Sequence, residues 1–180
     1  EKISSGRLDF ELETADLSEL VAESLRANAT AHQRFGLQIK CHGVDTPTYI
    51  ETDANRIIQV LTNLMSNAAK FSKPGGTVEI SVDKTPESVC VSVRDEGMGI
   101  APEDQHKIFQ RFADMANSDR ATKGGTGLGL SICKAIVEGL GGTIDFVSKE
   151  GRGTTFTFTL PVKTRHSGPE NDFERLENVG

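Results

Sequence analysis

The chain is poor in the residue patterns that build metal centres. It has 3 cysteines among 180 residues, and no two of them follow the C-x-x-C spacing of a zinc site. Its 4 histidines form neither an H-E-x-x-H nor an H-x-x-E-H pattern. We therefore expect buried, reduced thiols, as in cytosolic proteins, at Cys41, Cys90 and Cys133. We expect surface or loop positions for the histidines, which are His32, His42, His106 and His166.

Long apolar runs and an excess of positive charge are also missing. No apolar run approaches the ~20 residues of a membrane-spanning helix, and no signal peptide opens the chain. The net charge of −6 argues against a dedicated surface for nucleic acid or for an anionic membrane. With 36% hydrophobic and 26% charged residues, the composition indicates one soluble domain with a single core, for which we expect a cytoplasmic location.

Alternating and helical patterns of apolar residues predict a mixture of strands and helices. The expected strands are 7–14, 37–41, 49–50, 77–82, 88–93, 143–148 and 154–160. The expected helices are 16–28, 53–71, 103–112 and 128–138. Because the strands cluster in pairs, we expect an α+β fold of two layers. A mixed, mostly antiparallel sheet of about five strands would carry three main helices on one face.

Two of these helices have recognisable start and stop signals. Asp16 is expected to cap the first helix, with Glu19 three residues later completing a capping box. Asp53 is expected to cap the long helix, which should end where the residues 73–76 read Lys-Pro-Gly-Gly.

The segment 124–130, Gly-Gly-Thr-Gly-Leu-Gly-Leu, is the most informative motif. A glycine-rich turn that opens into a helix directs free N–H groups at an anion, so it predicts a phosphate cradle. No Lys-Ser or Lys-Thr pair closes it, which argues against a P-loop. Leu130 stands where the dinucleotide motif G-x-G-x-x-G would have its last glycine. A flexible linker remains the alternative.

The long helix carries a polar stripe beside its apolar one. Ile57, Val60, Leu61, Leu64, Ala68 and Phe71 should face the core. Asn63, Asn67 and Lys70 follow at i, i+4 and i+7 on the neighbouring flank. Amide oxygens can ligate Mg²⁺ and a lysine can contact phosphate, although a solvated helix edge would show the same pattern.

A third motif, Asp95-Glu96-Gly97-Met98-Gly99-Ile100, follows a predicted strand directly. The carboxylate of Asp95 could accept a hydrogen bond from an exocyclic amine, and the two glycines would let the backbone fold around a flat ring. An ordinary strand-ending turn is the alternative for this motif alone.

In this order, the three motifs resemble the catalytic, ATP-binding domain of bacterial sensor histidine kinases. These belong to the wider ATPase superfamily that includes gyrase, mismatch-repair and heat-shock chaperone proteins, and the resemblance implies their Bergerat fold. It covers about residues 8–162. The matching motifs are NRIIQVLTNLMSNAAKFS at 55–72, DEGMGI at 95–100, IFQRF at 108–112, GGTGLGLSI at 124–132 and GRGTTFTFTLP at 151–161.

The resemblance implies a site for ATP and Mg²⁺. Asn67 would bind the Mg²⁺, Lys70 would contact a phosphate, and Phe71 would lie near the adenine. Asp95 would accept from the adenine amino group and so select ATP over GTP, with support from Thr154, often through water. The other nucleotide-binding positions would be Gly97, Met98, Gly99, Ile100, Phe112, Gly125, Thr126, Gly127, Leu128, Gly129 and Leu130.

A nucleotide lid is implied at residues 113–126, which have little apolar content. Ile108, Phe109 and Phe112 would hold the start of this lid, and Arg111 would reach the phosphates. A segment of this composition is expected to order when nucleotide binds.

Asn63 stands where hydrolytic members of the superfamily carry a glutamate that activates water. An amide has no useful basicity, so attack by water on ATP should be slow. We therefore expect phosphoryl transfer to a histidine, assisted by Mg²⁺ and backbone dipoles, with Asn63, Asn67, Lys70 and Arg111 as the catalytic group.

The histidine that accepts phosphate in this family lies on an upstream helical hairpin, and no histidine here matches its motif. We expect residues 1–12 to be the connection from that hairpin, 13–163 the ATP-binding domain and 164–180 a polar linker or tail. The chain would then come from a longer protein and would not autophosphorylate alone. Its partners would be that hairpin and, through the full-length kinase, a response regulator.

This fragment is expected to be a monomer of a homodimeric parent, with no nucleic-acid partner and no membrane insertion of its own. The parent could be anchored in a membrane. Three alternatives remain from the sequence: an ATP-binding switch like the anti-sigma kinases, which phosphorylate a serine on a partner; a nucleotide-binding docking module without catalysis; and an ATP hydrolase.

Overall fold

The main sheet has five strands in the order β2-β4-β5-β7-β6. The computed structural model describes residues 8–111 and 127–162. The strands are β2 Gln38–His42, β4 Thr77–Lys84, β5 Ser88–Asp95, β6 Thr143–Lys149 and β7 Gly153–Pro161. Only the β2–β4 pair is parallel among these neighbours. A separate antiparallel pair joins β1 Glu13–Asp16 to β3 Tyr49–Thr52.

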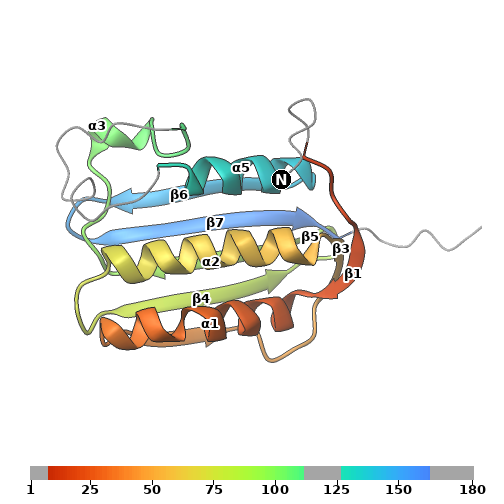
Figure 1. Ribbon diagram of the computed structural model, residues 1–180, viewed down its shortest axis with the longest axis horizontal. Coiled ribbons are helices and arrows are strands. Elements are labelled where there is room, and N and C mark those ends of the chain that lie inside the picture. Colours follow the sequence, from red (N-terminus) through yellow and green to blue (C-terminus); the bar gives the residue numbers. More distant parts are fainter. Residues whose placement is uncertain (1–7, 112–126, 163–180) are drawn as a thin grey trace, which may run out of the picture.

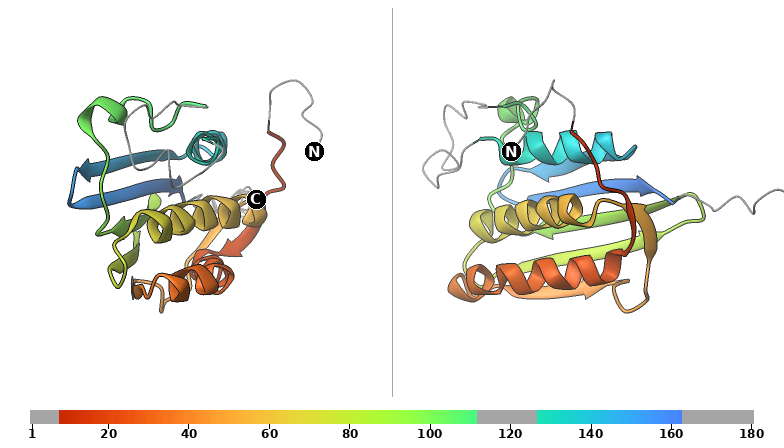
Figure 2. Two further views of the ribbon diagram at one scale, coloured as in Figure 1. Left: turned by 60° about the vertical axis from the view of Figure 1, so that its left-hand side comes forward. Right: turned by 45° about the vertical axis from the view of Figure 1, so that its right-hand side comes forward.

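Three long helices cover one face of this sheet (Figures 1 and 2). They are α1 Leu17–Arg34, α2 Ala54–Phe71 and α5 Gly129–Gly139, and a short helix, α3, spans Pro102–Gln105. In Figure 1, α2 lies between α1 and α5 over the middle of the sheet. The expected two-layer α+β fold with a mixed, mostly antiparallel five-stranded sheet is confirmed. No helix in the described ranges is both long and apolar enough to cross a bilayer.

Local signals explain where α1 and α2 begin. The Asp16 carboxylate accepts from the backbone N–H of Ser18 at 3.0 Å, and that of Asp53 accepts from Arg56 N at 3.0 Å. Both carboxylates therefore satisfy an N–H group that the first helical turn leaves without a partner. Asp16 also accepts from Thr48 N at 2.8 Å, which ties the start of α1 to the residue that directly precedes β3.

The core lies between α2 and the sheet. The predicted apolar stripe of α2 is buried throughout, from Ile57 at 0% exposure to Phe71 at 9%. The sheet contributes alternate residues of each central strand, which include Val78, Ile80, Val91, Val93, Phe156 and Phe158. Because side chains alternate across a strand, the residues between them form the opposite, helix-free face.

Three element predictions are corrected by the structure. The strand expected over 7–14 begins only at Glu13, because Phe10 packs instead on Gly139 of α5 and Glu11 N donates to Asp53. α1 continues past the expected end at Asn28 to Arg34. Two polar residues inside it bond back to the preceding turn, Ser24 Oγ to Leu20 O and Asn28 Nδ2 to Ser24 O.

The helix expected over 103–112 is limited to α3. The following backbone forms tight turns, in which Ile108 N donates to Gln105 O and Gln110 N to Lys107 O. This path buries Ile108 and lets Phe109 contact the core, which one face of a continuing helix would not do for adjacent residues.

The expectations for histidine and cysteine are right only in part. His32 is 5% exposed, against the expected surface position, because it lies on the sheet-facing side of α1. Cys133 is buried, whereas Cys41 and Cys90 are half-buried in strands, and all three are free thiols.

Candidate functional site

Helix α2 brings the three sequence motifs together. At its C-terminal end, Phe71 O accepts from Met98 N at 3.3 Å. Two turns earlier, the Asn63 side chain lies against Gly129 at the start of α5. At 1.5 Å per residue, these two contacts are about 12 Å apart along the helix, with Asn67 between them. The flank of α2 therefore spans from the Asp95 loop to the glycine-rich segment.

Asp95 closes one end of this span as a buried carboxylate. It is the last residue of β5, is 5% exposed, and accepts from Gly97 N through Oδ1 at 2.8 Å. Its register partner on β7 is Thr154, which is 2% exposed. A buried carboxylate is costly unless it is hydrogen-bonded, so its placement here requires polar neighbours or a ligand that donates to it.

Glycine is needed in the loop that follows Asp95 because other parts of the backbone come very close. A Cβ at Gly97 would collide with the carbonyl of Phe71, and one at Gly99 with that of Lys149. Gly99 also has a φ of +68°, which other residues rarely adopt. The loop therefore packs closely between the end of α2 and the β6–β7 turn, and Met98 is half-buried.

The start of α5 forms the other end of the span. Leu128 is the N-cap residue and makes no side-chain capping bond, and Gly127 before it has a φ of +65°. The Leu128 side chain therefore does not satisfy the first N–H groups of α5, and the helix dipole adds partial positive charge there. Such a terminus suits an anion.

The Asn63 amide contacts α5. A Cβ at Gly129 would collide with the Asn63 side chain, which also hydrogen-bonds to Cys133. Burial raises the pKa of the Cys133 thiol to about 12, against smaller opposing effects of hydrogen bonds from Asn63 and its own backbone. The thiol is therefore protonated at neutral pH and is not a nucleophile.

Lys70 lies beside Phe71, with its Nζ 5.1 Å from the ring centroid. Arg111 is exposed at the end of the first described range. Two residues before Arg111, the Phe109 ring packs edge-on against Phe146, with 5.8 Å between the ring centroids. Lys134 Nζ lies over the Phe109 ring, 5.6 Å from its centroid.

Most of the predicted site residues thus gather along α2. Those contributed by the helix itself and the Asp95 loop are Asn63, Asn67, Lys70, Phe71, Asp95, Gly97, Met98, Gly99 and Ile100. β7 contributes Thr154, and the segment opening α5 contributes Gly127, Leu128, Gly129 and Leu130. Phe112, Gly125, Thr126 and the expected lid at 113–126 lie outside the described residues.

Two residues at this site were missed by the sequence reasoning. Ser148 of β6 accepts from Ile100 N at 2.9 Å, and Gln105 Nε2 donates to Ile100 O at 3.1 Å. For Ser148 a signal exists, because it continues the inward series of Ile144 and Phe146 and is the first polar member of that series.

The side chains at this site offer too few ligand atoms to hold a divalent cation without a bound nucleotide. Among the described residues, no three His, Cys, Asp or Glu side chains are placed to hold a metal ion. Asn67 offers one amide oxygen, so phosphate oxygens and water would have to supply the remaining positions. This is the usual arrangement for Mg²⁺ bound with a nucleotide.

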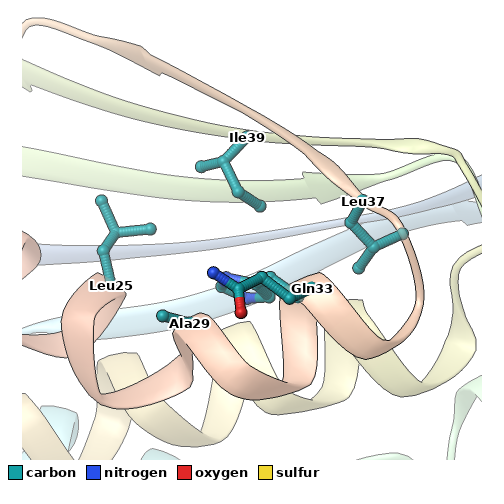
Figure 3. A pocket seen from close by; sticks show the side chains of 6 residues that line it. Leu25, Ala29, Gln33, Leu37 and Ile39 are labelled. Atoms are coloured by element: carbon teal, nitrogen blue, oxygen red, sulfur yellow. The ribbon is translucent and has the colours of Figure 1, made fainter.

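A pocket of about 330 Å³ lies away from these residues, between α1 and the edge strand β2 (Figure 3). Its lining residues are Leu25, Ala29, His32, Gln33, Leu37 and Ile39. Burial lowers the pKa of His32, against a smaller raising effect of a hydrogen bond with the Met65 backbone. Its Nε2 is buried and has no hydrogen-bond partner among the described residues.

Comparisons with known proteins identify the family. Residues 52–164 match the family described as histidine kinase-, DNA gyrase B-, and HSP90-like ATPase. The sensor histidine kinase WalK of Bacillus subtilis is 47% identical over 121 residues, which cover 66% of this chain and 20% of WalK. The chain thus spans about a fifth of that relative's length.

Solved structures show the same fold. The catalytic domain of histidine kinase ThkA superposes with a TM-score of 0.74 at 30% identity, over 85% of this chain and 97% of that one. Full-length ShkA in complex with AMPPNP gives a TM-score of 0.74 at 27% identity, over 86% of this chain and 32% of that one. The chain belongs to the histidine kinase-, DNA gyrase B-, and HSP90-like ATPase family, and its fold is that of histidine kinase catalytic domains.

Proposed function

We propose that this chain is the ATP-binding catalytic domain of a sensor histidine kinase. It would present Mg-ATP for phosphoryl transfer to a histidine on a helical hairpin outside this segment. The observation that carries the proposal is that the flank of α2 joins two chemically different groups, one at each end. One end holds the buried carboxylate of Asp95, and the other holds the start of α5, which the Leu128 side chain does not cap.

At the carboxylate end, Asp95 would accept a hydrogen bond from the amino group of adenine. Gly97 N already holds Oδ1, which fixes the plane of the carboxylate. Guanine carries a carbonyl oxygen where adenine carries the amino group, so two acceptors would face each other. Such a mismatch in a buried site discriminates strongly between otherwise similar ligands.

At the other end, the N–H groups of α5 and the ammonium group of Lys70 would bind the phosphates. Asn67 lies between the two ends and would hold Mg²⁺ by its amide oxygen. When bound, Mg²⁺ would neutralise part of the charge on the phosphate oxygens, so that the histidine nitrogen could approach the terminal phosphorus while ADP leaves.

Asn63 would act by holding α5, since its amide faces Gly129 and Cys133. It has no basicity with which to activate water, and ATP should therefore persist until a histidine is presented. In this proposal the acceptor hairpin belongs to the same parent protein, and a response regulator receives the phosphate afterwards. We also propose that the fragment is monomeric and that its parent is a homodimer.

Titration calorimetry with Mg-ATP and Mg-GTP tests the binding step. We expect binding of Mg-ATP and much weaker binding of Mg-GTP, while absence of heat with both would reduce the chain to a docking module. Incubation with the separate hairpin and labelled ATP tests the transfer step. An acid-labile phosphate on the hairpin is expected, whereas an acid-stable one would indicate a serine kinase.

A further inference from the structure

The inward faces of three neighbouring strands all become polar at the same level of the sheet. On β6 the series Ile144, Phe146 ends with Ser148; β7 begins its inward series with Thr154; and β5 ends with Asp95. The strand register pairs Asp95 with Thr154 and Thr154 with Ser148. These three side chains therefore form one lateral row, at the edge of an otherwise apolar layer.

We propose that Ser148 is a positioning residue for the purine end of the site. It would fix the loop that follows Asp95 and set the direction of the Thr154 hydroxyl. This inference rests on the proposed function and assigns to Ser148 a share in its selectivity for adenine.

The Ser148 hydroxyl makes three short contacts. Its oxygen accepts from Ile100 N at 2.9 Å, lies 2.8 Å from Thr154 Oγ1, and lies 3.1 Å from Gly153 O. A hydroxyl has one proton and two lone pairs. Once Ile100 N–H occupies a lone pair, the proton can go to Gly153 O or to Thr154.

The choice between these two acceptors decides what Thr154 can do. If Ser148 donates to Gly153 O, the Thr154 proton is drawn toward Ser148. If Ser148 donates to Thr154, the Thr154 proton is released toward the Asp95 side of the row. Ser148 thus determines whether Thr154 offers a donor or an acceptor to a bound purine or to a water beside it.

The loop itself rests on the β6–β7 turn. Gly151 N donates to Met98 O at 2.7 Å, and the carbonyl of Lys149 fills the space in front of Gly99. Gln105 Nε2 adds a second link by donating to Ile100 O at 3.1 Å and to Ser148 O at 3.4 Å. Loss of the Ser148 hydroxyl would leave the N–H of buried Ile100 without that partner, and the loop would shift to satisfy it.

The phosphate end is built from different contacts. The start of α5 is held by Asn63 of α2, and Asn67 and Lys70 project from α2 itself. Replacing Ser148 is therefore expected to weaken the purine contacts while the phosphate contacts persist. A hydroxyl that merely stabilised the β6–β7 turn would not produce this separation.

The test compares Ser148→Ala with a matched control, Ser92→Ala. Ser92 forms a similar cross-strand hydroxyl pair with Thr157 at 3.0 Å, but on the opposite, helix-free face of the sheet. Titration calorimetry would measure the binding of Mg-ATP, Mg-GTP and Mg-tripolyphosphate, which lacks a purine. We expect Ser148→Ala to raise the Kd for Mg-ATP about tenfold and to leave the Kd for Mg-tripolyphosphate unchanged. The preference for Mg-ATP over Mg-GTP, measured as the ratio of their Kd values, should become smaller.

Two further variants complete the design. Ser148→Thr, which keeps the hydroxyl, should restore the binding of Mg-ATP, and Ser92→Ala should bind like the wild type. If Ser148→Ala does not fold, Ser148→Cys keeps the size of the side chain with only a weak donor and should show the same selective loss.

Equal weakening of Mg-ATP and Mg-tripolyphosphate would overturn the inference, as would wild-type binding by the variant. If the wild type binds Mg-ATP and Ser148→Ala binds equally well, only the role of Ser148 fails. If the wild type binds no nucleotide, both the proposed function and the role of Ser148 fail.

Discussion

Replacement of Asp95 by asparagine tests the purine contact with almost no change in shape. The side chain is 5% exposed, and its Oδ1 accepts from Gly97 N at 2.8 Å. In Asp95→Asn the amide oxygen would keep this acceptor role, because Gly97 N can only donate. The NH₂ group would then face the ligand, where it would meet the amino group of adenine, donor against donor.

A buried polar group that loses its partner in this way costs about 1–3 kcal/mol. Since 1.4 kcal/mol corresponds to a factor of ten, the Kd for Mg-ATP should rise roughly 5- to 150-fold. Guanine offers an acceptor at the same place, so the Kd for Mg-GTP should fall relative to that for Mg-ATP.

Titration calorimetry of wild type and Asp95→Asn with both nucleotides, at one salt concentration, gives the four constants required. Circular dichroism would establish that the variant is folded. An unchanged Kd for Mg-ATP would mean that Asp95 is only a turn residue. Equal losses for ATP and GTP would mean that it acts on the fold of the loop rather than on the purine.

Three further predictions follow from the metal position, the N-terminal segment and the buried histidine. Asn67→Ala should weaken Mg-ATP binding more than metal-free ATP binding, and equal losses would remove Asn67 from the metal site. A Cβ at Gly139 would lie 2.5 Å from the Phe10 ring, so Gly139→Ala should lower the free energy of unfolding by about 1–3 kcal/mol; in a Phe10→Ala background that loss should vanish in denaturant titrations. Burial lowers the pKa of His32, so the unfolded chain binds this proton more readily and stability should fall as pH drops below about 6.5. His32→Gln should flatten this pH dependence of Tm, and an unchanged pH dependence would contradict the role given to His32.

Helix α2 could be predicted from sequence because every signal for it is local. Asp53 caps its first turn, the apolar stripe repeats at helical spacing, and the helix ends at Phe71, immediately before the Ser-Lys-Pro-Gly segment. Segment 8–12 shows the opposite case. Its apolar residues alternate as in a strand, but Leu8 and Leu12 are exposed and only Phe10 packs inward, on a helix more than a hundred residues later.

The residues proposed for the site could be named from the sequence because their signals are also local. Asn67, Asp95 and the glycines at the start of α5 stand in recognisable local motifs. The resemblance to a family implied that these motifs together bind one nucleotide. Ser148 is marked in the sequence only as the first polar residue of the inward series on β6. Its contact with Ile100 joins residues 48 positions apart and depends on how β6 sits in the sheet. The position of the Asp95 loop at the end of α2 likewise depends on a contact between distant residues, Met98 N with Phe71 O.

The central claim is that one nucleotide lies along α2, with its purine at Asp95 and its phosphates at the start of α5. A crystal structure of the domain with the Mg²⁺ complex of a non-hydrolysable ATP analogue tests it most directly. We expect the adenine amino group within hydrogen-bonding distance of the Asp95 carboxylate and the phosphates beside Asn67 and Gly129. Density for the analogue at any other place, or with the purine turned away from Asp95, would contradict the account.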